Sequence, residues 1–340
     1  MTPPLVAGWD VGGVNIKCAT VVGGRVTNAQ SKPFEIQRSP AALVGHLQSL
    51  AKSMSLSGDT AHAVTMTAEL SQLFRTKREG VAFVLDALDR AFLGAPIHVY
   101  TVDGTFLPTA DARANPMRVA ASNWHATASI VAHAWPDAIL VDIGSTTTDI
   151  IPLARGLVAA RGHSDPQRLS TAELLYLGAV RTPVEAIVQE VPLGTHMAGV
   201  SAESFALSGD VHTWLGDLPE GDYTTPTPDG RPVTREFVRE RLARIVCADR
   251  ELLDDRAIDD IARHVATAQV SRTARALARV RGPDAALPVV AAGIGAFLAR
   301  RAASLMGAPV ADLADLLGTA AARAAPAAAV ALLLASRDQP

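Results

Sequence analysis

The chain contains 340 residues, of which 19% are charged and 4% aromatic, and its formal net charge is −3. This length favours two domains, because a single hydrophobic core rarely grows beyond about 300 residues. The small net charge and the lack of a basic tract argue against binding to nucleic acid or to an anionic membrane, and the two cysteines, Cys18 and Cys247, argue against a disulfide scaffold or a thiolate zinc site.

The termini and the apolar runs bear on the compartment. The first ten residues lack the basic segment and the cleavage pattern of a signal peptide. The longest apolar runs, at 288–299 and 324–336, are too short to span a bilayer. We therefore expect a cytoplasmic protein.

A β-strand followed by a glycine turn is predicted near the N-terminus. Residues 5–11 form the apolar strand, and a second strand follows the turn. Glycines in such a turn let backbone N–H groups approach phosphate oxygens, and an aspartate at the strand end can bind Mg²⁺. The candidate residues are Asp10, Gly12, Gly13, Asn15 and Lys17. Lys17 would add positive charge, although a strand lysine is often simply solvated.

The next elements are two helices with a polar segment between them. Residues 41–54 and 81–92 carry apolar residues at helical spacing and are predicted to pack on a sheet. Between them, Glu69 follows an apolar strand in a segment of small and polar residues, where loops often form sites. A helix-capping or surface role for Glu69 is an equal alternative.

The first turn recurs in the middle of the chain. An offset of 132 positions aligns Asp10 with Asp142, Gly12 with Gly144 and Gly24 with Gly156. A lone Asp-x-Gly-Gly is usually a plain turn, but repetition in register favours a function. The second turn adds Ser145, Thr146 and Thr147, whose hydroxyl groups extend a phosphate cradle. Two such turns facing each other would clamp a phosphate and a metal ion.

The C-terminal half contains a polar connection, helices and a third glycine turn. Residues 207–231 are predicted to form a mobile connection or a lid, and 234–280 two or three amphipathic helices. The apolar residues 287–292 form a strand that ends in a turn with Gly293 and Gly295, followed by a helix to Met306. This turn would let a flat ring or a phosphate lie against the backbone.

Three segments together resemble the superfamily of acetate and sugar kinases, actin and heat-shock ATPases. They are Asp-x-Gly-Gly-x-Asn-x-Lys from position 10, Asp-Ile-Gly-Ser-Thr-Thr-Thr-Asp from position 142, and Ala-Ala-Gly-Ile-Gly from position 291. They are similar to its two phosphate motifs and its adenosine motif. The resemblance implies an α/β fold with two ribonuclease-H-like lobes around a central cleft. We place the lobes at residues 1–134 and 135–340, with the last helix able to pack back on the first lobe.

Further segments resemble a narrower family, the hydantoinase/oxoprolinase-related proteins of tetrahydromethanopterin-linked one-carbon metabolism. They are Thr-Met-Thr-Ala-Glu-Leu at 65–70, Phe-Arg-Thr-Lys-Arg-Glu-Gly-Val at 74–81, residues 141–152, Leu-Gly-Ala-Val-Arg-Thr-Pro at 177–183 and Thr-Pro-Asp-Gly-Arg at 227–231. The resemblance implies methanofuran or methylofuran biosynthesis. A transferase would join an aminomethylfuran-methyl diphosphate to γ-glutamyltyramine, forming an aryl ether and releasing diphosphate.

Under this resemblance the two turns would bind a leaving group. Asp10 and Asp142 would bind Mg²⁺. The diphosphate would be surrounded by Gly12, Gly13, Asn15, Lys17, Gly144, Ser145, Thr146 and Thr147, with Gly293 and Gly295 also contacting the substrate. Because a phenol has a pKa near 10, a base should assist it, and Glu69 is the first candidate, with His196 a weaker one. Lys77 and Arg78 could bind the γ-glutamyl carboxylates, although clustered cations usually face solvent.

Two other functions use the same motifs. An ATP-dependent kinase or oxoprolinase-like hydrolase would place ATP on the three turns, and so would a nucleotide-switched assembly protein of the actin or chaperone type. The expected substrates are small molecules. The oligomeric state is left undecided, with a homodimer as one possibility.

Overall fold

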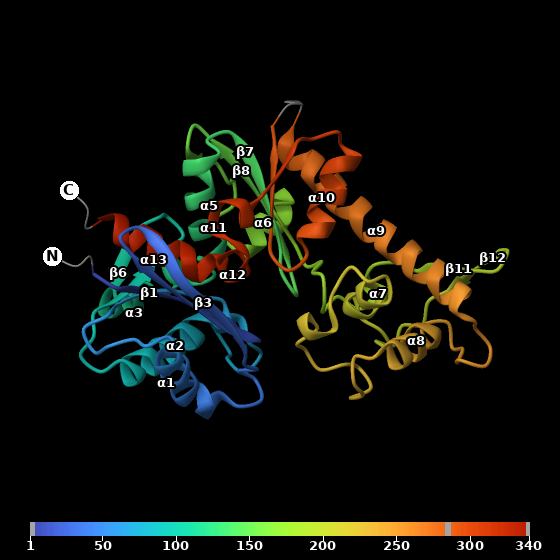
Figure 1. Cartoon of the computed structure of the whole chain (residues 1–340), viewed down its shortest axis with the longest axis horizontal. Coiled ribbons are helices and arrows are strands. Elements are labelled where there is room, and N and C mark those ends of the chain that lie inside the picture. The colour runs from blue at the N-terminus through green and yellow to red at the C-terminus, as the bar shows by residue number, and fades with distance from the viewer. Residues whose placement is uncertain (1–3, 283–286, 338–340) are drawn as a thin grey trace. The chain divides into compact units, whose positions relative to one another are not determined.

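Two sheets, one in each of two units of the chain, organise the computed structural model, which describes residues 4–282 and 287–337 (Figure 1). Unit 1 comprises Met1–Asp137, Leu153–Asp165 and Leu313–Pro340. Unit 2 comprises Ala138–Pro152 and Pro166–Asp312. The chain therefore leaves unit 1 and returns to it twice, and its C-terminal segment belongs to the unit in which the chain begins.

The sheet of unit 1 has six strands in the order β3-β2-β1-β4-β5-β6. The first three strands are antiparallel neighbours, whereas β4 and β5 run parallel to β1. The strand β1 is buried along its whole length, because helices cover both faces of the sheet. The strands are β1 (Val6–Val11), β2 (Asn15–Val22), β3 (Arg25–Pro33), β4 (Ala61–Met66), β5 (Ile97–Tyr100) and β6 (Phe106–Pro108).

One face of this sheet is covered by the two helices predicted from apolar spacing. They are α1 (Leu43–Ser53) and α2 (Lys77–Ala91), and their leucines and valines share a core with Trp9, Val11 and Ile16. The remaining short elements of the unit are η1 (Pro40–Ala42), η2 (Ala68–Leu70), α3 (Thr109–Ala114), α4 (Pro116–Val119), β9 (Leu157–Val158), α11 (Leu313–Leu317) and α12 (Thr319–Arg323).

The opposite face is covered by the last helix, α13 (Ala325–Arg337), which contacts β1, β2, β4 and α5 (Asn123–Ala134) (Figure 1). The approach is unusually close at Gly8 of β1. A Cβ atom there would lie 1.9 Å from the Ala327 carbonyl oxygen and 2.8 Å from Ala331 Cβ. Small residues on both elements thus allow the contact, and this explains why the C-terminal apolar run is mainly alanine.

The sheet of unit 2 repeats this order of strands. Its path is β10-β8-β7-β13-β14, and β9 also pairs with β8. Strand β13 runs parallel to both β7 and β14. The strands are β7 (Ala138–Ile143), β8 (Thr148–Ala154), β10 (Leu174–Leu175), β13 (Val289–Ala292) and β14 (Val310–Asp312), and α10 (Ala296–Leu305) packs on β13 and β7.

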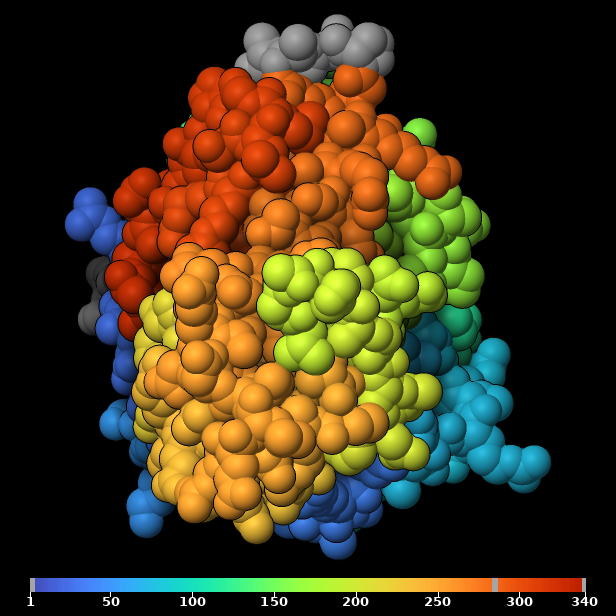
Figure 2. All heavy atoms as spheres, turned by 90° about the vertical axis from the view of Figure 1, so that its right-hand side faces the viewer, coloured from blue at the N-terminus to red at the C-terminus, as the bar shows by residue number. Residues whose placement is uncertain are grey.

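A helical region extends unit 2. The region contains η3 (Val184–Ala186), α7 (Ser208–Trp214), η4 (Glu220–Asp222), α8 (Arg235–Arg244), α9 (Asp255–Arg281) and the hairpin β11 (Glu190–Leu193) and β12 (His196–Gly199). The helix α6 (Asp165–Thr171) begins at Asp165, the last residue of the second segment of unit 1, and continues into unit 2. The helices α7 and α8 and the strand β11 pack on α9. Figure 2 faces this region and shows the hairpin residues, in yellow-green, over the orange residues of the helical region.

The prediction of an irregular connection over 207–231 is wrong in part, since α7 and η4 lie within it. Two buried contacts order this segment. Tyr223 packs so closely on Gly209 that a Cβ atom there would lie 1.9 Å from the ring. The buried Arg241 donates hydrogen bonds to Asp210 Oδ1 at 2.8 Å and to Asp229 Oδ1 at 3.1 Å. Both ends of the segment are therefore tied to the helical region.

Both sheets have the ribonuclease-H-like arrangement, in which an antiparallel hairpin is extended by parallel strands beside the first strand. The predicted repeat is confirmed, because the hairpin β1-β2 corresponds to β7-β8. The predicted α/β class and the third strand, turn and helix are confirmed as well. Among the described residues, no helix combines the length and apolar composition that crossing a bilayer requires.

The contact between β1 and α13 predicts the effect of one methyl group. Gly8→Ala forces Cβ onto the Ala327 carbonyl, so the backbone of α13 must move, and the free energy of unfolding should fall by roughly 1–3 kcal/mol. Thermal unfolding followed by circular dichroism measures the change. Gly45→Ala is the matched control, because a Cβ at Gly45 in α1 meets open space. A wild-type melting temperature for Gly8→Ala would contradict this packing.

Candidate functional site

The first candidate turn lies at the end of β1 in unit 1. The Gly12 N–H donates a hydrogen bond to the Asn15 carbonyl at 3.1 Å, which closes the turn into β2. A Cβ on Gly12 would lie 2.6 Å from that carbonyl oxygen, whereas a Cβ on Gly13 would have no neighbour within 4 Å. Gly12 is therefore required by packing. Gly13 leaves its side of the turn open to a ligand.

Asp10 is buried next to this turn and pairs with Lys17. The two residues are opposite each other in the β1-β2 register, and Lys17 Nζ lies 3.1 Å from Asp10 Oδ2. Asp10 is 3% exposed, and its other oxygen, Oδ1, has no hydrogen-bond partner among the described residues. A buried carboxylate oxygen without a partner is costly unless a ligand satisfies it. The arrangement thus fits a cation bound through Oδ1.

The donor set limits which cation could bind. Within residues 4–282 and 287–337, no group of three or more His, Cys, Asp or Glu side chains could hold a metal ion. A protein-only cage for zinc or calcium is therefore not what these residues build. Mg²⁺ commonly uses one or two carboxylates and takes its other ligands from water and substrate phosphates. Asp10 suits that mode, and its metal role remains a prediction.

Glu69 lies at the same edge of the sheet as Asp10. The strands β1 and β4 are parallel, with Val11 opposite Met66, so their carboxyl ends coincide, and the Thr67 N–H bonds to the Val11 carbonyl at 3.0 Å. Glu69 follows in η2. Gly80 of α2 packs against it, and a Cβ on Gly80 would lie 2.5 Å from the Glu69 carbonyl oxygen. The backbone that carries Glu69 is therefore firmly held.

The Glu69 carboxylate is buried without a hydrogen-bond partner. Its exposure is 1%, and among the described residues neither Oε1 nor Oε2 has a partner. Burial raises the pKa of Glu69 from about 4.5 to about 7. Lys77 and the backbone N–H of Glu69 itself, which does not reach hydrogen-bond geometry, lower this pKa, and Asp165 and Asp10 raise it. The alternative of a capping or surface role for Glu69 is wrong. A buried carboxyl group with a pKa near neutrality can accept a proton at physiological pH.

Lys77 has a partner that the sequence did not indicate. Its Nζ lies 2.7 Å from Asp165 Oδ2, across 88 positions of sequence. Lys77 is the first residue of α2, and Asp165 is the first of α6. The ion pair engages the Lys77 ammonium, and the predicted contact of Lys77 with a γ-glutamyl carboxylate stays a prediction. Arg78, the next residue, is exposed on α2.

The second candidate turn, at the end of β7 in unit 2, has the same form. The Gly144 N–H donates to the Thr147 carbonyl at 2.9 Å, as Gly12 does to Asn15. Ser145, Thr146 and Thr147 are all partly exposed. Their predicted contact with phosphate is compatible with this exposure and remains a prediction.

Gly293 and Gly295 stand beside this turn. Gly293 has a φ of +81°, and a Cβ there would lie 2.4 Å from Asp142 Oδ1. The Gly295 N–H donates to the Ile143 carbonyl at 2.8 Å. The third glycine motif therefore makes room for the Asp142 side chain. Its predicted contact with a substrate stays a prediction.

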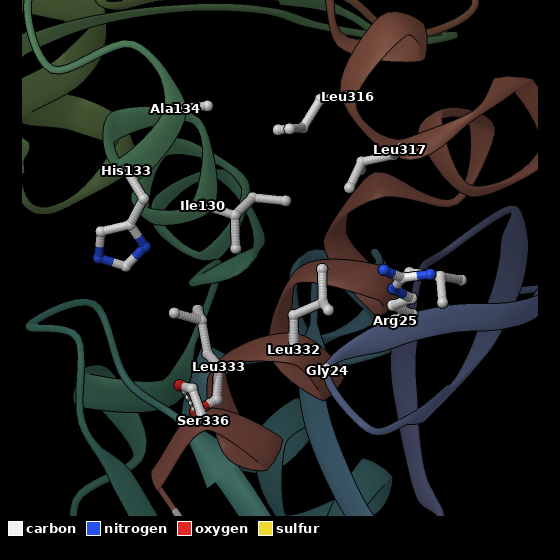
Figure 3. A pocket seen from close by; sticks show the side chains of 11 residues that line it. Gly24, Arg25, Ile130, His133, Ala134, Leu316, Leu317, Leu332, Leu333 and Ser336 are labelled. Atoms are coloured by element: carbon white, nitrogen blue, oxygen red, sulfur yellow. Dashed lines mark hydrogen bonds between the residues drawn. The ribbon is translucent and has the colours of Figure 1, made fainter. Parts of the chain in front are cut away.

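Two other features lie away from these turns. His196 is exposed on β12 of the two-stranded hairpin. A cavity of about 750 Å³ in unit 1 is lined by apolar side chains of α5, α11 and α13, with Arg25 and His133 at its edge (Figure 3). No candidate site residue lines this cavity, so it does not mark the site.

The pKa of Glu69 predicts a pH-dependent effect of Glu69→Gln on stability. The pKa of Glu69 is higher in the folded state than in the unfolded state. The contribution of the neutral acid to the free energy of unfolding is therefore fully present below about pH 4.5 and is lost as the pH rises through about 7. Glutamine removes the cost of ionisation, which is roughly 3 kcal/mol. The variant should therefore gain melting temperature over the wild type at pH 8 but not at pH 4.5.

Thermal unfolding at the two pH values measures this difference. Glu251→Gln is the control, because Glu251 is exposed and should show no pH-dependent difference. An offset between Glu69→Gln and wild type that is equal at both pH values would show that Glu69 does not titrate as described.

The chain matches known proteins over most of its length. The family model for hydantoinase/oxoprolinase matches residues 60–336. A Methanocaldococcus jannaschii protein, (4-{4-[2-(gamma-L-glutamylamino)ethyl]phenoxymethyl}furan-2-yl)methanamine synthase, is 38% identical over 259 residues, which cover 76% of each chain. A Methanococcus vannielii protein of the same name is 41% identical over 111 residues, covering 33% of this chain and 50% of that protein.

One solved structure shares the fold over most of the chain. It is the nucleotide-free structure of acetone carboxylase, an enzyme of ATP-dependent acetone carboxylation. The match covers 97% of this chain and 70% of the acetone carboxylase chain, at a TM-score of 0.56 and 10% sequence identity. The likeness at this identity concerns the fold alone. From the extent of the family match and the identity to the M. jannaschii protein, the chain belongs to the hydantoinase/oxoprolinase family.

Proposed function

We propose that the chain is a transferase that joins an aminomethylfuran-methyl diphosphate to γ-glutamyltyramine, forming an aryl ether and releasing diphosphate. The observation that carries the proposal is the Glu69 carboxyl group, buried with both oxygens unpartnered among the described residues, at the sheet edge that also carries Asp10. A site of this kind offers a base for the acceptor beside a carboxylate for a metal-bound leaving group.

The relatives support the choice of reaction. The name of the M. jannaschii protein describes a furan joined through a phenoxymethyl group to a γ-glutamylaminoethyl chain. A synthase of such a compound can form the bond between the phenol oxygen and the furan-methyl carbon. We carry that chemistry to this chain because the similarity covers 76% of both proteins.

Bond cleavage depends on stabilising the departing diphosphate. The bond between the furan-methyl carbon and the diphosphate oxygen breaks, and the ring oxygen stabilises the positive charge that develops on carbon. Lys17 and the open side of Gly13 in unit 1, and the hydroxyl groups after Gly144 in unit 2, would hold the diphosphate. Charges and dipoles fixed in advance are the main source of catalysis for such a step.

Bond formation uses the acceptor phenol. Its oxygen forms the new bond to the furan-methyl carbon, and its proton passes to Glu69. A base with a pKa of about 7 is ionised in a useful fraction at neutral pH and still accepts a proton as the phenol becomes acidic in the transition state. The products are the ether, the diphosphate and a protonated Glu69 that returns its proton to water.

The metal role falls to the two aspartates. Asp10, through its unpartnered Oδ1, and Asp142 are the proposed ligands of Mg²⁺. When bound, Mg²⁺ would neutralise charge on the diphosphate oxygens. Lys77, which also pairs with Asp165, and the exposed Arg78 are the proposed contacts of the γ-glutamyl carboxylates.

Product analysis tests the reaction directly. The full chain, incubated with the furan diphosphate, γ-glutamyltyramine and Mg²⁺, should form the ether detected by mass spectrometry, with one diphosphate released per ether. Consumption of ATP in the absence of the furan diphosphate, without ether formation, would overturn the proposal and favour the kinase or hydrolase function.

The aspartate variants test the leaving-group half of the site. Asp142→Asn and Asp10→Asn should each lower Mg²⁺-dependent diphosphate release by at least about a hundredfold, because a neutral amide is a poor Mg²⁺ ligand. The fold should survive, as judged by circular dichroism. Asp315→Asn is the matched control, since Asp315 is exposed on α11. Wild-type turnover in Asp142→Asn would remove Asp142 from the mechanism.

The pH dependence of the rate tests the base. In the wild type kcat should rise with pH through about 7, as Glu69 loses its proton. Glu69→Gln should lower kcat about 10²–10⁴-fold and abolish this limb of the profile. If kcat of Glu69→Gln still rises with pH through about 7, the group that titrates is not Glu69.

A further inference from the structure

A short backbone segment, residues 177–182, packs against the second turn and forms backbone hydrogen bonds to it. The Ala179 N–H donates to the Gly144 carbonyl at 2.9 Å, and the Arg181 N–H donates to the Ser145 carbonyl at 2.9 Å. Gly178 approaches most closely. A Cβ on Gly178 would lie 2.3 Å from the Ser145 carbonyl oxygen and 2.4 Å from the Thr146 nitrogen. The position of Gly178 therefore fixes the position of the turn.

A buried glutamine holds Gly178. Gln269, on the long helix α9, is fully buried, and its Nε2 donates to the Gly178 carbonyl at 2.9 Å across 91 positions of sequence. Ser208 Oγ donates to the same carbonyl at 2.9 Å, and Thr182 Oγ1 does so at 3.3 Å. The Gly178 N–H donates to Thr182 Oγ1 at 2.8 Å. Both polar groups of the Gly178 backbone are thus engaged by side chains from unit 2.

The orientation of the Gln269 amide is set by a second partner. Its Oε1 lies 2.9 Å from His212 Nε2, on α7. An amide oxygen can only accept, so His212 Nε2 donates and the Gln269 NH₂ group faces Gly178. With the amide reversed, its oxygen would face the Gly178 carbonyl oxygen. One rotamer alone satisfies both partners.

We infer that Gln269 is a positioning residue for the diphosphate, acting through Gly178 on the Ser145 and Thr146 backbone of the second turn. The inference rests on the proposed function, because it takes this turn as a diphosphate site. A buried amide in a helix stabilises little over an apolar side chain of the same size, so stability is not a sufficient reason for it. Holding a turn to within a few tenths of an ångström is a task that a directional hydrogen bond performs.

Gln269→Leu removes the bond to Gly178 and keeps the approximate volume of the side chain. The turn should then shift, and the dissociation constant for inorganic diphosphate in the presence of Mg²⁺, measured by titration calorimetry on the full chain, should rise roughly tenfold. The dissociation constant for γ-glutamyltyramine should stay unchanged. A general loss of structure would instead weaken the binding of both diphosphate and γ-glutamyltyramine.

Thr273→Val is the matched control. Thr273 is buried one turn further along α9, and among the residues that the structure describes its hydroxyl bonds only to the Gln269 carbonyl, at 3.1 Å. This variant should lose some melting temperature and keep the wild-type affinity for diphosphate. If Thr273→Val lowers the affinity for diphosphate as much as Gln269→Leu does, Gln269 affects binding only through the stability of the fold, and the inference is wrong.

A measurement without ligand separates this inference from the proposed function. Hydrogen exchange of a peptide that spans residues 144–147 should be faster in Gln269→Leu than in the wild type, and unchanged in Thr273→Val. Ser208→Ala removes a second side-chain donor to the Gly178 carbonyl without altering α9 and leaves the longer bond from Thr182 Oγ1 in place. It should change exchange in the same direction and serves if Gln269→Leu fails to fold. Wild-type exchange in Gln269→Leu, or in Ser208→Ala if the former does not fold, would overturn the inference. A wild-type chain that binds no diphosphate would overturn the proposed function instead.

Discussion

Close backbone approaches that only glycine permits fix the candidate site in both units. In unit 1, Gly80 brings α2 against the backbone of Glu69. In unit 2, Gly178 brings residues 177–182 against Ser145. Such contacts cannot relax by rotation of a side chain, because the atoms in contact belong to the backbone. The fold therefore positions the Glu69 backbone and the second turn through the main chain.

The second determinant is the way charge is distributed around Glu69. The Lys77 ammonium is near enough to lower the pKa of Glu69, yet it is bonded to Asp165. Had Lys77 bonded to Glu69, the carboxylate would be stabilised in its ionised form and would be a weaker base. At Asp10 the opposite arrangement holds, since Lys17 neutralises one oxygen and leaves the other without a partner. Two buried carboxyl groups at one sheet edge are thus suited to different tasks.

The sequence predicted the repeated parts of the fold well. The Asp-led glycine turns occur at the ends of β1 and β7, and the third glycine turn follows β13, because strand period and turn chemistry are local properties that residue order records. The resemblance to the hydantoinase/oxoprolinase family is confirmed by the match over residues 60–336. The roles of the individual turn residues in binding phosphate stay predictions.

Contacts between residues that are far apart in the sequence could not be predicted from local patterns. Asp165 lies 88 positions from Lys77, and Gln269 lies 91 positions from Gly178, and nothing in the local pattern of either residue distinguishes it from a surface or core residue. The helix α7 was missed for a related reason. Its segment is rich in residues typical of loops, and it is ordered by the buried Asp210, which accepts hydrogen bonds from Tyr223 in the same segment and from Arg241, 31 positions away. Tertiary context overrides local preference at these positions.

Electron paramagnetic resonance with Mn²⁺ in place of Mg²⁺ tests most directly whether the Asp-led turns bind a metal-complexed diphosphate, as we propose. Mn²⁺ should bind the full chain tightly only when inorganic diphosphate is present, and its spectrum should show hyperfine coupling to ³¹P. Tight Mn²⁺ binding that is indifferent to diphosphate, or a bound Mn²⁺ without phosphorus coupling, would contradict this proposal.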